Sequence, residues 1–112
     1  MPDSRETIGA VFASLKASYR AGLPAKLSAF TDLLDLLEQE PNSRELAKKL
    51  LLEVHKFHGS AGSYGFPRIS EIAGEWELRL KSVSEQEEKV GESHLQEYRN
   101  YLRRIENAAR AE

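Results

Sequence analysis

Apolar side chains recur every three or four residues along most of this chain, and no stretch alternates apolar and polar residues as a strand would. This periodicity predicts helices over about residues 5–21, 24–40, 43–64, 67–82 and 90–109. We therefore expect an all-α fold, an up-down-up-down antiparallel four-helix bundle with residues 5–21 as an additional N-terminal helix. The sequence AGLPAK fits a kink as well as a loop, so the first two segments could instead form one bent helix.

A chain of 112 residues is long enough to bury its own core, so we expect one domain over residues 1–112. Its formal net charge of −2 leaves no overall field that would draw it onto nucleic acid or an anionic membrane. The absence of cysteine excludes disulfides, thiolate zinc sites and cysteine nucleophiles. The start, MPDSRETIGAVF, has neither the pattern of a secretory signal nor the length of a membrane span. We expect a cytoplasmic monomer.

Local signals mark the ends of the helix predicted over residues 43–64. Asn42 or Ser43 can cap its start with a side-chain oxygen. Gly65 suits the left-handed conformation that often ends a helix, and Pro67 follows two residues later. In the next predicted helix we expect Trp76 to lie in the core.

The stretch EVHKFHGSAGSYGFP, residues 53–67, holds two of the three histidines and three of the seven glycines. On a helix, Val54 and Phe57 belong to the core stripe, so His55 should stand beside this stripe with its ring outward. Side chains lean toward the helix N-terminus, so any residue larger than Gly59 would crowd the imidazole. A reachable neutral imidazole, with an ordinary pKa of about 6.5, can attack a phosphoryl group and hold it as a phosphoramidate. We interpret His55 as a nucleophile left open to a partner.

The residues after His55 follow a definite order: an apolar residue, glycines with small residues, a glycine that ends the helix, and a helix with apolar residues and a glutamate. They are Phe57, Gly59, Ser60, Ala61, Gly62, Gly65, Phe66, Ile69, Ala73, Trp76 and Glu77. In this order the chain resembles the histidine-containing phosphotransfer (HPt) domain family. The motif covers about residues 54–77, and the predicted helices on both sides extend the resemblance over nearly the whole chain.

The resemblance implies a histidine phosphotransfer protein of a two-component phosphorelay. His55 would accept a phosphoryl group on Nε2 from a receiver aspartate or a histidine kinase and pass it to a receiver aspartate, and Glu77 would orient the ring. The partners would be response regulator receiver domains and a hybrid sensor histidine kinase. Magnesium would belong to the receiver, so this chain would need no cofactor. It has no kinase ATP-binding domain and should not phosphorylate itself.

The chain departs from the family pattern at His58, where the family usually has a lysine. A lysine would supply a permanent positive charge beside the phosphate, whereas a histidine supplies one only when protonated. Lys56 points about 100° away around the helix and is an imperfect substitute, and Arg68 is another candidate cation. Our hypothesis is that His58 makes phosphate stability or transfer at His55 sensitive to pH between about 6 and 8.

Two alternatives stay open at this point. The bundle could be a docking module that binds receivers without being phosphorylated. His55 and His58 have a spacing that can share a metal ion, but HKFHG lacks the HExxH form, so we expect no metal site. The surface that docks a partner should surround His55 and include Leu51, Leu52, Lys56, His58, Gly59 and Ser63.

Overall fold

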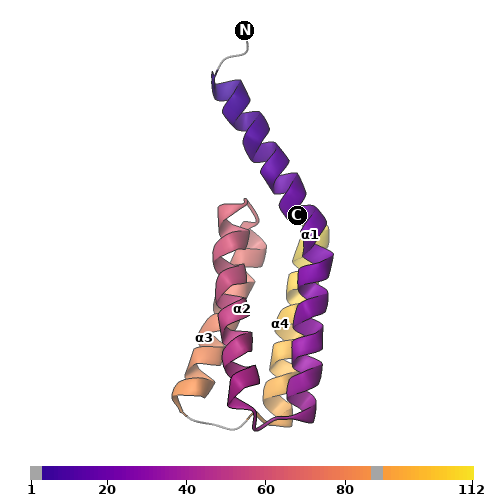
Figure 1. Ribbon diagram of the computed structural model, residues 1–112, viewed down its shortest axis with the longest axis vertical. Helices are drawn as coiled ribbons and strands as arrows, with labels where there is room; N and C mark the ends of the chain where they lie inside the picture. Colours follow the sequence, from indigo (N-terminus) through magenta and orange to yellow (C-terminus); the bar gives the residue numbers. More distant parts are fainter. Residues whose placement is uncertain (1–3, 87–89) are drawn as a thin grey trace.

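The computed structural model describes residues 4–86 and 90–112, which form four helices (Figure 1). The helices are α1 (Ser4–Gln39), α2 (Arg44–Ser63), α3 (Pro67–Glu85) and α4 (Glu92–Ala111). Because the described residues contain no strand, the prediction of an all-α fold is confirmed. None of the helices found in this part of the chain combines the length and apolar character needed to cross a membrane.

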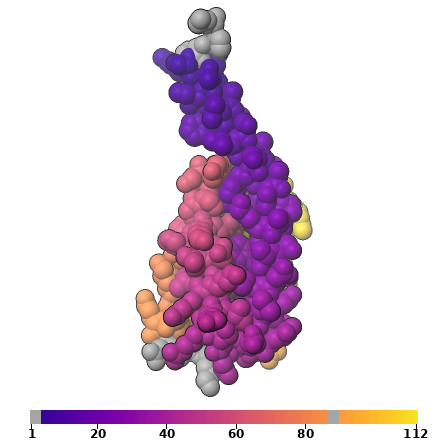
Figure 2. Space-filling view, viewed as in Figure 1, coloured from indigo at the N-terminus to yellow at the C-terminus, as the bar shows by residue number. Residues whose placement is uncertain are grey.

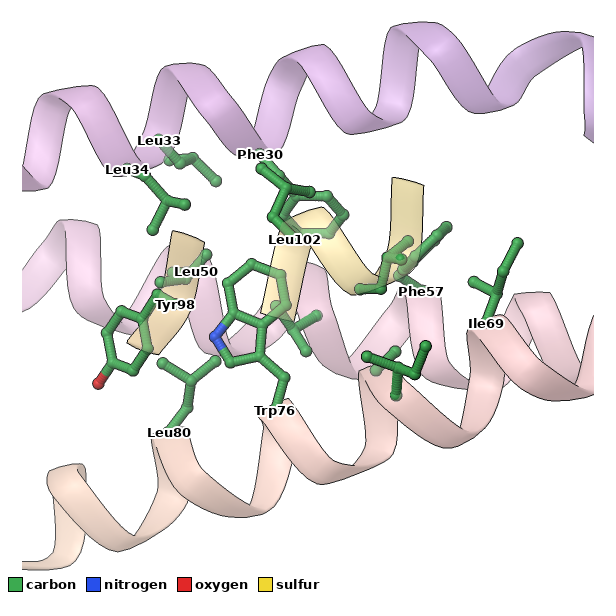
Figure 3. Close-up of a cluster of buried hydrophobic side chains, with 14 of the residues drawn as sticks. Phe30, Leu33, Leu34, Leu50, Phe57, Ile69, Trp76, Leu80, Tyr98 and Leu102 are labelled. Atoms are coloured by element: carbon green, nitrogen blue, oxygen red, sulfur yellow. The ribbon is translucent and has the colours of Figure 1, made fainter. Parts of the chain in front are cut away.

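The four helices lie side by side, and each runs opposite to the one before it in the chain (Figure 1). α1 and α3 each pack against both α2 and α4. Aromatic rings from all four helices meet in the interior (Figure 3). The Phe30 ring centroid lies 5.4 Å from that of Phe57 and 5.5 Å from that of Trp76, and Tyr98 lies 6.3 Å from Trp76. Rings with edge and tilted contacts at these distances add to the stability that burial gives this core.

α1 differs from the prediction of two helices. Residues 5–21 and 24–40 belong to one helix with Pro24 in its interior, so the additional N-terminal helix is not a separate element. A proline inside a helix costs about 3 kcal/mol, because it removes a hydrogen bond and crowds the preceding turn. Leu23 and Phe30 are both buried in the bundle, and their packing holds the chain helical on both sides of Pro24. The first part of α1 projects beyond the other helices (Figures 1 and 2).

A tight turn fixes α3 against α2. Gly65 has a φ of 88°, a left-handed conformation that glycine adopts without strain. The Gly65 N–H donates to the Gly62 carbonyl at 3.3 Å, and the Phe66 N–H donates to the Ala61 carbonyl at 2.8 Å. These two bonds make a Schellman ending, and Pro67 begins α3 at once. The short connection brings the end of α2 and the start of α3 into register.

The remaining helix ends lie near the predicted positions. Ser43, and not Asn42, caps α2, because its hydroxyl accepts a hydrogen bond from the Leu46 N–H at 3.2 Å. α3 continues three residues beyond the predicted end at 82, to Glu85. Residues 83–85, which the prediction left between two helices, are therefore helical, and residues 87–89 lie outside the described residues.

Candidate functional site

His55 lies on the surface of α2, next to the fully buried Val54. Its side chain is 64 % exposed, and its Nδ1 lies 2.8 Å from Oε2 of Glu77 on α3. The helical spacing explains this position, because a residue adjacent to the core stripe stands at its edge. The ring is thus open to solvent on one side and held by a carboxylate on the other.

Glu77 is buried, with a side chain only 7 % exposed, and it carries the electrostatics of the site. Burial by itself raises the pKa of the Glu77 carboxyl, but hydrogen bonds from two histidines and a lysine, together with the charge on His55, outweigh burial and lower this pKa to about 2. The three donors are His55, Lys81 and His58. Glu77 is therefore a carboxylate at neutral pH, and its buried charge is compensated by its neighbours.

The protonation state of Glu77 determines which ring nitrogen of His55 carries the proton. An ionised carboxylate can only accept hydrogen bonds, so Nδ1 of His55 donates to it. A neutral ring that is protonated on Nδ1 keeps its lone pair on Nε2. Because Nε2 is on the other edge of an exposed ring, the nitrogen with the lone pair faces away from the carboxylate. The arrangement presents this lone pair in a fixed tautomer and orientation.

His58 binds the second oxygen of the same carboxylate. Its Nδ1 lies 3.1 Å from Oε1 of Glu77, and its side chain is 44 % exposed. Its ring lies close to Gly74, where a Cβ atom would come within 3.0 Å of the His58 Nε2. Gly74 therefore makes room for His58, a role that the sequence analysis missed because no local signal connects residues 58 and 74.

Lys81 was also missed as a member of the site. Its Nζ lies 3.0 Å from Oε2 of Glu77, the oxygen that also binds His55. The spacing of four residues between Glu77 and Lys81 on one helix was the signal that could have found it. Lys81 places a permanent positive charge beside the buried carboxylate. The two histidines supply no such charge when they are neutral.

Comparison of the sequence with known proteins identifies the family to which this chain belongs. A family model described as the Hpt domain matches residues 15–108. The chain belongs to the Hpt domain family. Hpt domains take part in phosphotransfer within two-component phosphorelays, where they interact with receiver domains and kinases. The comparisons with curated proteins and with solved structures found no match.

Gly59 of this Hpt domain does not relieve a crowded histidine. A Cβ atom at position 59 would meet nothing within 4 Å, so the predicted crowding of the imidazole does not occur for a methyl group. The physical reason is that Glu77 holds the His55 ring toward α3, so that the ring does not lie under position 59. Gly62 is different, because a Cβ atom there would lie 3.0 Å from the Ser70 hydroxyl at the contact between α2 and α3.

The two other candidate cations form ion pairs with nearby acids. Lys56 lies on the surface of α2, with its Nζ 3.5 Å from Oε1 of Glu53. The Arg68 guanidinium lies 3.3 Å from Oε2 of Glu71, in the first turns of α3. In this Hpt domain the permanent cation that binds the site carboxylate is Lys81.

The residues predicted to dock a partner differ in exposure. Leu52 and Ser63 are exposed on α2, whereas Leu51 is half-buried and packs against the core. Leu51 therefore contributes to the packing of α2 on the core, and Leu52 presents the larger exposed apolar surface. Among the described residues, no group of three or more His, Cys, Asp or Glu side chains is arranged to hold a metal ion.

Proposed function

We propose that His55 is the phosphoacceptor of a phosphorelay intermediate. Its Nε2 attacks the phosphorus of an aspartyl phosphate on a receiver domain, so that a P–N bond forms while the P–O bond to the aspartate breaks. The aspartate leaves as a carboxylate. The reverse reaction on a second receiver returns the phosphoryl group to an aspartate. A hybrid sensor histidine kinase is a further possible donor. The observation that carries the proposal is the 2.8 Å contact between Nδ1 of exposed His55 and buried Glu77.

Glu77 is proposed to stabilise the phosphorylated ring. When Nε2 bonds to phosphorus while Nδ1 keeps its proton, the ring carries a positive charge. The ionised Glu77 already lies beside Nδ1, so no group has to move to balance that charge. The negative field of Glu77 also has to be limited, because a phosphoryl group is itself negative. Lys81 and His58 on the same carboxylate serve this purpose.

The rest of the chemistry is assigned to the partner. Phosphoryl transfer depends mainly on positioning and on electrostatic stabilisation, and a metal ion usually supplies much of the latter. We assign the magnesium and the acidic residues that hold it to the receiver domain, while this chain supplies the nucleophile without a cofactor. Gly59, Leu52 and Ser63 are proposed to form part of the surface on which the receiver docks.

Phosphate labelling tests the proposal. Incubation with a phosphorylated receiver or a kinase should give a label on the protein that is lost in acid and stable in base. The label should disappear in His55→Gln. It should persist in His94→Gln, the matched control, because His94 lies at the start of α4, where its Nδ1 accepts a hydrogen bond from the Gly91 N–H at 3.0 Å. Circular dichroism should show that both variants are folded.

The role of Glu77 is tested separately. Glu77→Gln keeps the size of the side chain but removes its charge, and the rate of phosphotransfer should fall about tenfold to a hundredfold, as expected for loss of a partner that orients a reactive histidine. If the parent protein takes up no label from several donors but binds receivers, the docking module is the better description. A label that survives in His55→Gln would contradict the proposal directly.

A further inference from the structure

α1 carries large apolar side chains on a face that the bundle does not cover. Ile8, Val11, Phe12 and Leu15 lie on its projecting part, with exposed fractions between 43 % and 64 %. Leu36, near the other end of the same helix, is 45 % exposed. Scattered exposed apolar residues are ordinary, but a row of them on one helix of a small domain marks an interaction surface.

The exposed residues follow a seven-residue repeat along the whole of α1. Ile8, Leu15, Gly22, Ala29 and Leu36 lie at intervals of seven, and each is exposed or half-exposed. Such a repeat keeps one seam of a helix facing a neighbouring helix, as in a coiled coil. The seam has large residues at both ends and small ones at positions 22 and 29. The small residues at positions 22 and 29 allow the axis of a second helix to come close to α1 near its middle, while the large residues contact that helix toward both ends.

α1 also has opposite charges in its two halves. Residues 4–22 contain three bases and one acid: Arg5, Lys16, Arg20 and Glu6. Residues 23–39 contain one base and three acids: Lys26, Asp32, Asp35 and Glu38. Arg99 of α4 pairs with two of these acids, which weakens the contrast without reversing it. Two α1 helices side by side would attract each other if antiparallel, because unlike halves would then be neighbours.

We propose that two copies of this chain form an antiparallel dimer through α1, with a two-fold axis beside Gly22. Positions equally far from the axis then face each other, so Ile8 of one copy meets Leu36 of the other, and Leu15 meets Ala29. Gly22 meets its own counterpart, and the lack of a side chain there permits a close crossing. The dimer departs from the monomer expected from the sequence.

The groove between α1 and α2 suits this arrangement. Leu33 and Leu36 of α1 and Phe57 of α2 are among its apolar lining, and the projecting part of the second copy would lie along it. The charged side chains that line the same groove are Lys26, Asp32, Lys49, Glu53 and Lys56, so the attraction between unlike halves comes from α1 alone and the apolar contacts carry this part of the interface. The His55 ring is held toward α3 by Glu77, on the other side of α2. The dimer therefore leaves the nucleophile accessible, and the inference does not depend on the proposed phosphotransfer.

Charges placed at Gly22 test the axis. A Cβ atom at this position would meet only the flexible end of Lys26, at 3.7 Å, so a side chain fits the isolated fold. In sedimentation equilibrium, the parent should be a dimer, whereas Gly22→Glu and Gly22→Lys should each be monomers, because like charges meet at the axis. A parent that stays monomeric up to its solubility limit, or variants that dimerise alone, would overturn the proposal.

Disulfide trapping tests the orientation. The chain has no cysteine, so introduced ones are unique. Ile8 and Leu36 are about 42 Å apart along one helix, so only a second copy can bring them together. On mild oxidation, a mixture of Ile8→Cys and Leu36→Cys should give a crosslinked dimer, and neither variant alone should. Leu78→Cys, at a 69 % exposed position on α3, is the control that should not crosslink with either. Efficient crosslinking of Ile8→Cys to itself would show parallel helices and refute the antiparallel dimer.

Discussion

The exposed surface around His55 and the outer face of α1 differ in how much of their structure one chain can complete. Around His55, the buried Glu77 contacts three partners on α2 and α3 at 2.8 to 3.1 Å among the described residues. On α1, Phe12 is 64 % exposed among other apolar residues. An uncompensated buried charge would strongly destabilise the fold. An exposed apolar side chain costs the single chain little and can be buried later by a binding partner. The polar contacts around His55 are formed within one chain, whereas the apolar side chains on the outer face of α1 stay uncovered, which is why we propose a second copy there.

Two phenylalanines give the largest test of this difference. Phe57→Ala, in the core beside Phe30, should lower the free energy of unfolding by about 3–5 kcal/mol, because it leaves a cavity. Phe12→Ala should change it by less than about 0.5 kcal/mol, because that side chain is largely exposed within one chain. Urea unfolding at low protein concentration, where the monomer dominates, measures both. Equal losses would mean that the outer face of α1 is packed within one chain.

The pH dependence of stability tests the buried carboxylate. The pKa of Glu77 in the folded protein is about 2, below its ordinary value of 4.5. The ionised group therefore stabilises the fold at pH values above about 4.5, and this contribution is lost as the pH falls toward 2. It amounts to about 3 kcal/mol. Acid unfolding of the parent and of Glu77→Gln should converge over this range. A constant difference between them would show that Glu77 is not held ionised.

Gly59 and Gly74 allow a test of whether a glycine is needed for partner binding or for packing within the fold. Gly59→Ala should stabilise the free protein by about 0.5–1 kcal/mol, because the position is helical and open, and it should weaken receiver binding. Gly74→Ala should increase the free energy of unfolding by less than Gly59→Ala does, because its methyl group would displace the His58 ring. Thermal unfolding and NMR of the histidine rings measure the two effects. Destabilisation by Gly59→Ala would show that the fold itself needs that glycine.

The smallest expected effect concerns His58. One added charge about 4 Å from the phosphate in a wet site contributes about 1 kcal/mol, or about fivefold in a rate. Between pH 6 and 8, about where an ordinary imidazole titrates, the phosphate half-life and transfer rate of the parent should therefore change. The rates of His58→Lys should change less over the same range, because residue 58 then stays charged throughout. A parent profile that matches that of His58→Lys would contradict the hypothesis that His58 makes the site sensitive to pH.

Local signals in the sequence were enough to predict several features of the α2–α3 surface. Gly65 and Pro67 lie at the end of α2 as predicted, because left-handed φ and a missing N–H are properties of single residues. The spacing around Val54 placed His55 outside the core. Gly74 was not predicted, because its role depends on which atoms of α2 face α3, and that information is absent from any one helix. Lys81 was overlooked, although its spacing of four residues from Glu77 on α3 was visible in the sequence.

The amino-acid sequence by itself determined an all-helical chain, an exposed histidine at the edge of a core stripe, and the family motif around it. It could do so because periodicity, capping and turn chemistry act over a few residues. Only the tertiary structure decided that α1 passes through Pro24 as one helix and that one carboxylate holds both histidines. In both cases the outcome depends on packing between segments far apart in the chain, which can outweigh local preference.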